Sequence, residues 1–168
     1  MTSEIMRLSG GLLIVLCGAL SGILKSRSFR TRVELIGEYL RFLTQVEAAV
    51  GYTAESISSL LANMRGLSLF APVLKDTSEL MQNGSSFESA WCSAVKRFVT
   101  NGEDRQLMYS FGRTFGTDNI QGELSKLALH KQNAETHYTG LSAELKTKSR
   151  LYRTLGVFCG VMTAALII

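Results

Sequence analysis

Two runs without a charged side chain, one near each end of the chain, most constrain what this sequence can fold into. Residues 8–24 read LSGGLLIVLCGALSGIL, and residues 154–168 read TLGVFCGVMTAALII. A transmembrane helix needs roughly 20 mostly apolar residues, so both runs are short, but flanking Arg and Tyr side chains can extend them. The sequence therefore predicts two transmembrane helices, 8–24 and 154–168, around a polar domain of residues 25–153.

The first run also has features of a secretory signal peptide. Arg7 precedes it, and Ala19-Leu20-Ser21 offers the small residues of a cleavage site. A cluster of basic residues follows this run at once, which favours an anchor that is retained over a cleaved signal. We therefore expect the first run to stay in the protein as a membrane helix.

Basic residues flank both runs on the side of the central domain. Four follow the first run and four precede the second: Lys25, Arg27, Arg30, Arg32, Lys146, Lys148, Arg150 and Arg153. Because basic flanks stay in the cytoplasm, we expect a hairpin with both termini outside and a cytoplasmic central domain. These eight residues account for the net charge of +4, which indicates contact with membrane lipids rather than with nucleic acid.

Each run contains two glycines four residues apart. The pairs are Gly18 with Gly22 and Gly156 with Gly160. Such spacing bares one face of a helix and lets two backbones approach closely, so we predict that the spans pack there on each other or on partner spans. The alternative is that glycine is simply common in membrane helices.

Helical periodicity extends through the central domain. Apolar residues recur at steps of three and four, only one proline occurs, and no segment alternates as a strand would. The sequence predicts an all-α fold, a six-helix bundle whose first and last helices extend into the two transmembrane anchors. The first expected helix continues the first anchor to about Val50, and a short helix follows from Thr53 to Gly66. Two further helices are expected over 68–82 and 103–115, with one between them that is capped by Ser85 and Glu88. The last expected helix is a rod of about 50 residues that begins at a capping box of Asp118 and Gln121.

No pattern of reactive residues points to an enzyme. The sequence lacks a nucleotide-binding loop, a serine-hydrolase elbow and a zinc-protease motif. His130 and His137 lie seven apart on one helix face, too few for a metal site, and are predicted to be ordinary surface or groove residues. We expect no catalytic residues, no cofactor and no metal.

Other polar and aromatic residues have plain structural interpretations. The glutamates of the first long helix, Glu34, Glu38 and Glu47, are predicted to lie on solvated faces, and Trp91 in the core. The three cysteines, Cys17, Cys92 and Cys159, are predicted to be small apolar residues in a reducing compartment.

One stretch resembles a known family. Residues 111–118 read FGRTFGTD and are followed by Gln121, similar to the FG-x-x-LG run with a nearby Asp and Gln of the stage III sporulation protein AB family of endospore-forming bacteria. Phe115 stands where that family usually has Leu. Residues 47–53 and 87–91 are similar to further family segments, and length and order agree along nearly the whole chain.

The resemblance implies a function. The family is similar to the cytoplasmic domain of the inner-membrane platform protein F of type II secretion and type IV pilus systems, a six-helix bundle. It implies a non-enzymatic part of the sporulation export channel between mother cell and forespore, in the mother-cell membrane facing the forespore. The implied partners are other stage III sporulation proteins, including a secretion-ATPase-like protein. Self-association of the chain stays open.

Two other functions stay open beside this one. The chain resembles a platform protein of an ordinary secretion or pilus machine, although those usually carry two bundles and three spans. A membrane adaptor without an export role is the third alternative. Within the family motif, we predict that Phe111, Gly112, Phe115 and Gly116 form a structural corner, that Gly116 has a positive φ, and that Asp118 caps the last helix.

Overall fold

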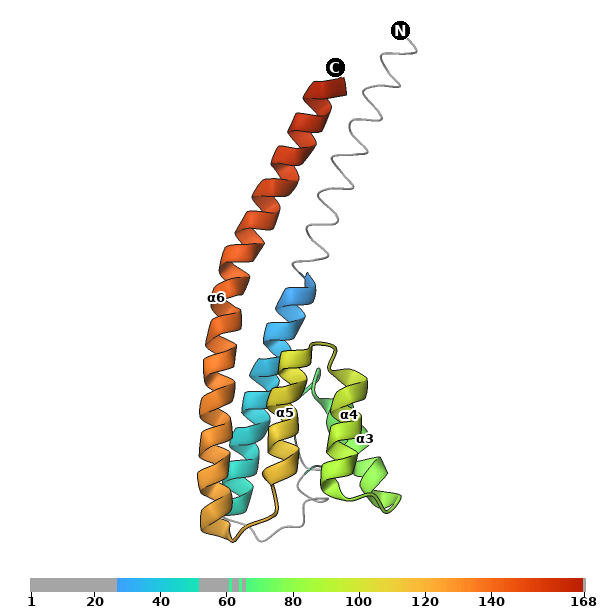
Figure 1. The fold of residues 1–168 in the computed structure, drawn as a ribbon, viewed down its shortest axis with the longest axis vertical. Helices are drawn as coiled ribbons and strands as arrows, with labels where there is room; N and C mark the ends of the chain where they lie inside the picture. The colour runs from blue at the N-terminus through green and yellow to red at the C-terminus, as the bar shows by residue number, and fades with distance from the viewer. Residues whose placement is uncertain (1–26, 52–60, 62–63, 65, 168) are drawn as a thin grey trace. The chain divides into compact units, whose positions relative to one another are not determined.

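The structure is a computed structural model that describes residues 27–51, 61, 64 and 66–167. The regular secondary structure among these residues is α-helical, with turns and loops between the helices, which confirms the predicted all-α fold. The described helices are 27–51, α3 (Ala71–Gln82), α4 (Phe87–Phe98), α5 (Gly102–Thr114) and α6 (Ile120–Ile167) (Figure 1). The predicted anchor 8–24 and most of the predicted short helix between Thr53 and Gly66 lie outside the described residues.

Contacts divide the chain into two compact units. The first unit is Glu34–Thr139, called the bundle below, and the second, called the terminal unit, has 27–33 and 140–167 as its described residues. The predicted central domain of residues 25–153 is longer than the bundle at both ends. Within the described residues, no helix combines the length and the apolarity that crossing a membrane requires.

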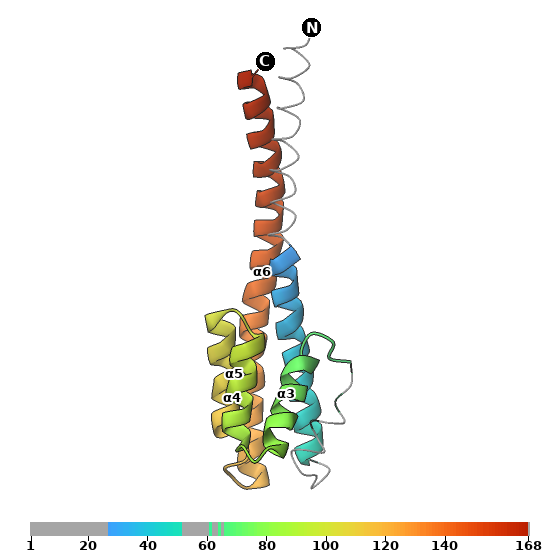
Figure 2. The ribbon, with the colours of Figure 1, turned by 90° about the vertical axis from the view of Figure 1, so that its right-hand side faces the viewer.

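Helix 27–51 and the first part of α6 lie side by side and antiparallel in the bundle (Figures 1 and 2). Lys131 Nζ of α6 lies 3.1 Å from Glu47 Oε2 of helix 27–51. Nearer the other end of this pair of helices, the ring of Tyr138 lies 3.3 Å from the position that a Cβ would take at Gly37. Next to this pair, α3 packs on α4, and α4 packs on α5 (Figure 2).

Rings from every part of the bundle meet at its centre. We call the following residues the aromatic cluster: Tyr39, Phe42, Phe70, Phe87, Trp91, Phe111, Phe115 and His130. Trp91 lies in the middle, with ring centroids 5.1 Å from Phe111 and 5.3 Å from Phe42, and it is completely buried. The predicted core position of Trp91 is confirmed. Burial of large aromatic side chains contributes most to a core of this size.

Glu38 on helix 27–51 supplies the cap that α3 lacks. Phe70, the N-cap residue of α3, has no side-chain cap, and α3 starts three residues later than the predicted residue 68. Ser68 Oγ donates to Glu38 Oε1 (3.0 Å), and the N–H groups of Leu69 and Phe70 donate to Glu38 Oε2 (2.8 Å each). A carboxylate satisfies the free N–H groups of a helix start and is favoured by the helix dipole. The prediction that Glu38 is solvated is wrong, since its side chain is buried.

Local caps start the next two helices. Ser86 Oγ accepts a hydrogen bond from the N–H of Ser89 at the start of α4, so the predicted cap at Ser85 is displaced by one residue. Asn101 Oδ1 accepts from the N–H groups of Glu103 (2.9 Å) and Asp104 (3.3 Å) at the start of α5. Short polar side chains are favoured there because they satisfy N–H groups that have no partner within the helix.

Candidate functional site

The family motif occupies the end of α5, where Gly112 makes room for Trp91. A Cβ at Gly112 would lie only 2.3 Å from Trp91 Cδ1. The indole therefore lies directly on the α5 backbone, and its Nε1 donates a hydrogen bond to the carbonyl of Met108 (2.8 Å). Phe111 next to Gly112 is also completely buried and turns its ring into the aromatic cluster.

Phe115 and Gly116 end α5 and reverse the chain. The N–H of Phe115 still bonds to the carbonyl of Phe111 (3.0 Å), but its ψ of 133° is extended. Its ring stays in the aromatic cluster, 4.9 Å from Phe111 and 5.6 Å from Phe87. Gly116 follows with φ of +83°, which confirms the positive φ predicted for it. Glycine is favoured here because a Cβ makes this region of backbone conformation costly.

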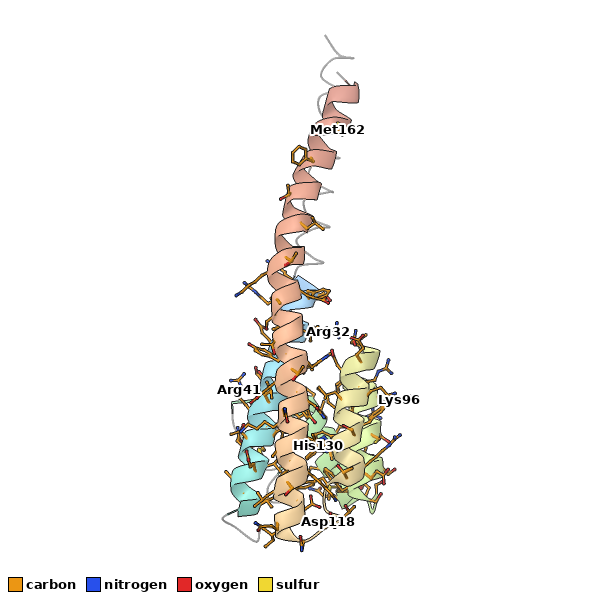
Figure 3. The ribbon with its side chains drawn as sticks, turned by 60° about the vertical axis from the view of Figure 1, so that its left-hand side comes forward. Arg32, Arg41, Lys96, Asp118, His130 and Met162 are labelled. Carbon is orange, nitrogen blue, oxygen red and sulfur yellow. The ribbon has the colours of Figure 1, made fainter. Side chains whose placement is uncertain are left out.

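Two side chains of α6 hold the turn from Gly116 to Asn119 in place. Glu123 Oε1 accepts hydrogen bonds from the N–H groups of Thr117 (3.0 Å) and Asp118 (2.9 Å). Lys126 Nζ donates to Thr117 Oγ1 (2.7 Å) and lies 2.9 Å from Asp118 Oδ2. Figure 3 shows Asp118 at the end of the bundle where α6 begins. Glu123 is buried, so its carboxylate is well placed to fix the turn.

The cap of α6 differs from the predicted one. Asn119 Oδ1 accepts a hydrogen bond from the N–H of Gly122 (2.9 Å), so Asn119 is the capping residue. Asp118 instead pairs with Lys126, and Gln121 is exposed. The predicted capping box of Asp118 and Gln121 is therefore wrong, because the chain is still in the turn at Asp118.

The two histidines of α6 both contact α5. His130 Nε2 lies 2.8 Å from Thr114 Oγ1, and Nδ1 lies 3.4 Å from Ser110 Oγ. Burial lowers the pKa of His130; Glu123 and Lys126 have smaller, opposed effects. The predicted surface or groove position is therefore wrong for His130, which is buried. His137 is less buried, and its Nε2 lies 2.6 Å from the buried Oδ1 of Asp104.

The other predicted site residues belong to the terminal unit. Arg27, Arg30 and Lys146 are exposed, and Arg32 is half-buried. At five further positions the structure gives only the helical backbone: Lys148, Arg150, Arg153, Gly156 and Gly160. The predicted residues Gly18, Gly22 and Lys25 lie outside the described residues. The proposed packing of the glycine pairs stays a prediction.

Metal-ligating side chains and pockets are the remaining candidates for a site among the described residues. Among the described residues, no group of three or more His, Cys, Asp or Glu side chains is arranged to hold a metal. A cavity of about 410 Å³ lies beside α3, with Leu61, Leu67 and Leu74 in its lining. The charged residues of that lining, Lys75 and Glu79, lie 3.8 Å from each other in one helix.

The protein-family model of stage III sporulation protein AB matches residues 7–168 of this chain. The chain belongs to the stage III sporulation protein AB family. The predicted resemblance is thereby confirmed over almost the whole sequence, including both uncharged runs. Searches of curated proteins and of solved structures find no match.

In this member of the stage III sporulation protein AB family, the motif residues build the junction of α4, α5 and α6. Phe111 and Phe115 pack, Gly112 admits an indole, and Gly116 turns the chain. Sequence reasoning missed Glu38 and Glu123, which organise the starts of α3 and α6. Each is a single glutamate within a helical stretch, a pattern that buried and exposed carboxylates share.

Proposed function

We propose that this chain is a non-enzymatic platform protein of the sporulation export complex between mother cell and forespore. Its bundle docks a secretion-ATPase-like partner on the cytoplasmic side. The family match over residues 7–168 carries the proposal, because it spans the bundle and both runs that we propose as anchors.

The roles of the motif residues support a scaffold. Phe111, Gly112, Phe115 and Gly116 serve packing and chain reversal at the centre of the bundle. The polar groups beside them, Glu123 and Lys126, bond to backbone or to Asp118 and Thr117 in the turn. Because these polar groups stabilise the turn, they favour a rigid module that presents a fixed surface to a docking partner.

The membrane placement has support from sequence and structure. We propose that residues 8–24 and 154–168 are the two anchors of a six-helix protein whose central domain is cytoplasmic. On α6, Leu151, Phe158 and Met162 are spaced by seven and four residues, which places them on one helix face, and all three are exposed. Exposed apolar side chains in a row favour contact with lipid or with another membrane helix.

Deleting the gene in a sporulating host tests the sporulation role. We expect heat-resistant spores to fall steeply in number and small forespores to arrest after engulfment. Restoring the wild-type gene should recover both. Normal spore numbers after deletion would contradict the proposal and favour an ordinary secretion platform or an adaptor.

Affinity capture tests the docking role. The tagged full chain, extracted in detergent from sporulating cells, should capture a secretion-ATPase-like protein together with other stage III sporulation proteins. A matched sample from vegetative cells that express the same tagged chain controls for non-specific binding. Capture of the membrane partners without any ATPase would support an adaptor and exclude the motor-docking role.

A further inference from the structure

The charge of this chain is divided unequally between its two units. Residues 1–33 and 140–168 hold nine of the 18 Lys and Arg residues but only two of the 14 Asp and Glu residues. The bundle, residues 34–139, holds the other nine basic and twelve acidic residues. The positive net charge of the chain therefore comes entirely from the terminal unit, and the bundle is net negative.

Three exposed basic side chains of the terminal unit have no carboxylate partner among the described residues, unlike several basic residues of the bundle. Arg27, Arg30 and Lys146 are exposed, and none of them forms an ion pair with any residue that the structure describes. In the bundle, three basic residues pair closely with carboxylates: Arg97 with Asp76 (2.6 Å), Lys126 with Asp118 (2.9 Å) and Lys131 with Glu47 (3.1 Å). The terminal unit thus presents positive charge that is available to an external anion.

The apolar face of α6 follows directly after these basic side chains. Leu151 is 54% exposed, Phe158 64% and Met162 67%, and all three come after Lys146 on the same helix. Figure 3 shows Met162 near the far end of α6. A zone of positive charge followed by exposed apolar side chains matches the order of a lipid leaflet, with head groups first and acyl chains behind them.

We propose that Arg27, Arg30 and Lys146, called the basic collar below, bind the phosphate groups of anionic phospholipids. The chain then associates with phosphatidylglycerol in preference to phosphatidylcholine. This inference rests on the membrane placement proposed above. Guanidinium and ammonium groups form charge-assisted hydrogen bonds to phosphate oxygens, and one basic residue near an anionic surface contributes about 1 kcal/mol, equivalent to roughly five-fold in association.

Spin-labelled lipids measure this preference directly. The full chain is reconstituted in phosphatidylcholine vesicles that contain a trace of labelled phosphatidylglycerol or labelled phosphatidylcholine, and the protein-bound fraction of each label is compared. We expect the wild-type chain to favour phosphatidylglycerol by roughly five-fold or more. The triple variant Arg27→Gln, Arg30→Gln, Lys146→Gln should show a clearly smaller preference for phosphatidylglycerol than the wild type.

A second triple variant keeps the same change in charge but places it in the bundle. Lys75, Lys96 and Arg113 are exposed, and their replacement by Gln should leave the lipid preference unchanged. Equal association of both labels with the wild-type chain would overturn the inference, as would an equal loss in the two triple variants. Inorganic phosphate, added at the concentration of the lipid phosphate, should not displace the labelled lipid. Displacement would instead identify a general anion site.

The outcomes also separate this inference from the proposed function. A chain that fails to enter vesicles of any composition contradicts the membrane placement itself. A chain that enters phosphatidylcholine vesicles but shows no lipid preference contradicts only the role of the basic collar. Circular dichroism of both triple variants confirms that neither has lost its helical fold.

Discussion

At the scale of single residues, Gly112 decides how α4 and α5 approach each other. In Gly112→Ala, the new methyl group would lie 2.3 Å from a carbon of the fully buried Trp91 ring, so one helix has to move. We expect a loss of about 1–3 kcal/mol in the free energy of unfolding from overpacking, against a gain of up to about 1 kcal/mol in helix propensity. Chemical denaturation of the detergent-solubilised chain measures the net loss.

Gly102→Ala is the matched control for Gly112→Ala. Gly102 is also in α5, and a Cβ there meets nothing within 4 Å. Its replacement should change the free energy of unfolding by no more than about 0.5 kcal/mol. If the two variants were equally stable, the close approach of Trp91 to the α5 backbone would be wrong.

The backbone conformation of Gly116 determines how much stability is lost when another residue replaces it. At its φ of +83°, Gly116→Val places a β-branched side chain in a region that such residues avoid. We expect a fall of about 1–3 kcal/mol in stability. Gly116→Asn should cost less, because Asn tolerates the left-handed region. Thermal melting that gives the same temperature for Gly116→Val as for the wild type would contradict the turn.

At the scale of helices, the start of α3 depends on a carboxylate from another helix. Glu38→Ala removes the carboxylate that accepts three hydrogen bonds, including those from the N–H groups of Leu69 and Phe70. We expect a loss of about 1.5–3 kcal/mol, the range for hydrogen bonds to a charged group. Hydrogen exchange should also become faster at the start of α3.

Glu34→Ala provides the control for the cap of α3. Glu34 lies one helical turn before Glu38 and is exposed, so its removal should change stability by no more than about 0.5 kcal/mol. Unchanged exchange at Leu69 and Phe70 in Glu38→Ala would show that α3 begins without help from helix 27–51.

The contact between α5 and α6 should weaken in acid through His130. Burial lowers the pKa of this imidazole in the folded chain, so the unfolded chain binds the proton more readily. Its contribution to stability is therefore complete above the unfolded pKa of about 6.5 and decreases as the pH falls below that value. Unfolding free energies measured between pH 8 and 5 should fall less steeply in His130→Gln than in the wild type.

His137 is present in both the wild type and His130→Gln, so the difference between their pH profiles reports on His130 alone. His137 Nε2 lies 2.6 Å from Asp104 Oδ1, a contact that the His130→Gln substitution does not touch. Parallel pH profiles for the wild type and His130→Gln would contradict a titrating role for His130.

At the scale of the whole molecule, the bundle contains its own core. All members of the aromatic cluster lie between Tyr39 and His130, inside the unit Glu34–Thr139. We expect a fragment of residues 34–139 to unfold in one cooperative thermal transition when followed by circular dichroism. The same fragment with Trp91→Ala should lose this cooperativity, because cavities left by large buried aromatic residues cost about 3–5 kcal/mol. A gradual loss of helix in the unsubstituted fragment would contradict an independent core.

The sequence by itself determined the class of fold and the family. Helical periodicity is local, since residues three and four apart share a helix face, so it predicts helices without knowledge of their neighbours. The positive φ of Gly116 is also local, because the glycine follows the last apolar turn of α5. The motif FGRTFG is recognisable for the same reason, as its spacing lies within one helix end.

Only the tertiary structure decided which polar residues became part of the interior. Glu34 and Glu38 look alike in the sequence, yet one is exposed and the other caps a helix that begins more than 30 residues later. Asp104 and His137 are likewise 33 residues apart in the chain. Whether a carboxylate lies in water or against unpaired N–H groups depends on which helix packs beside it. The local sequence does not specify that neighbouring helix.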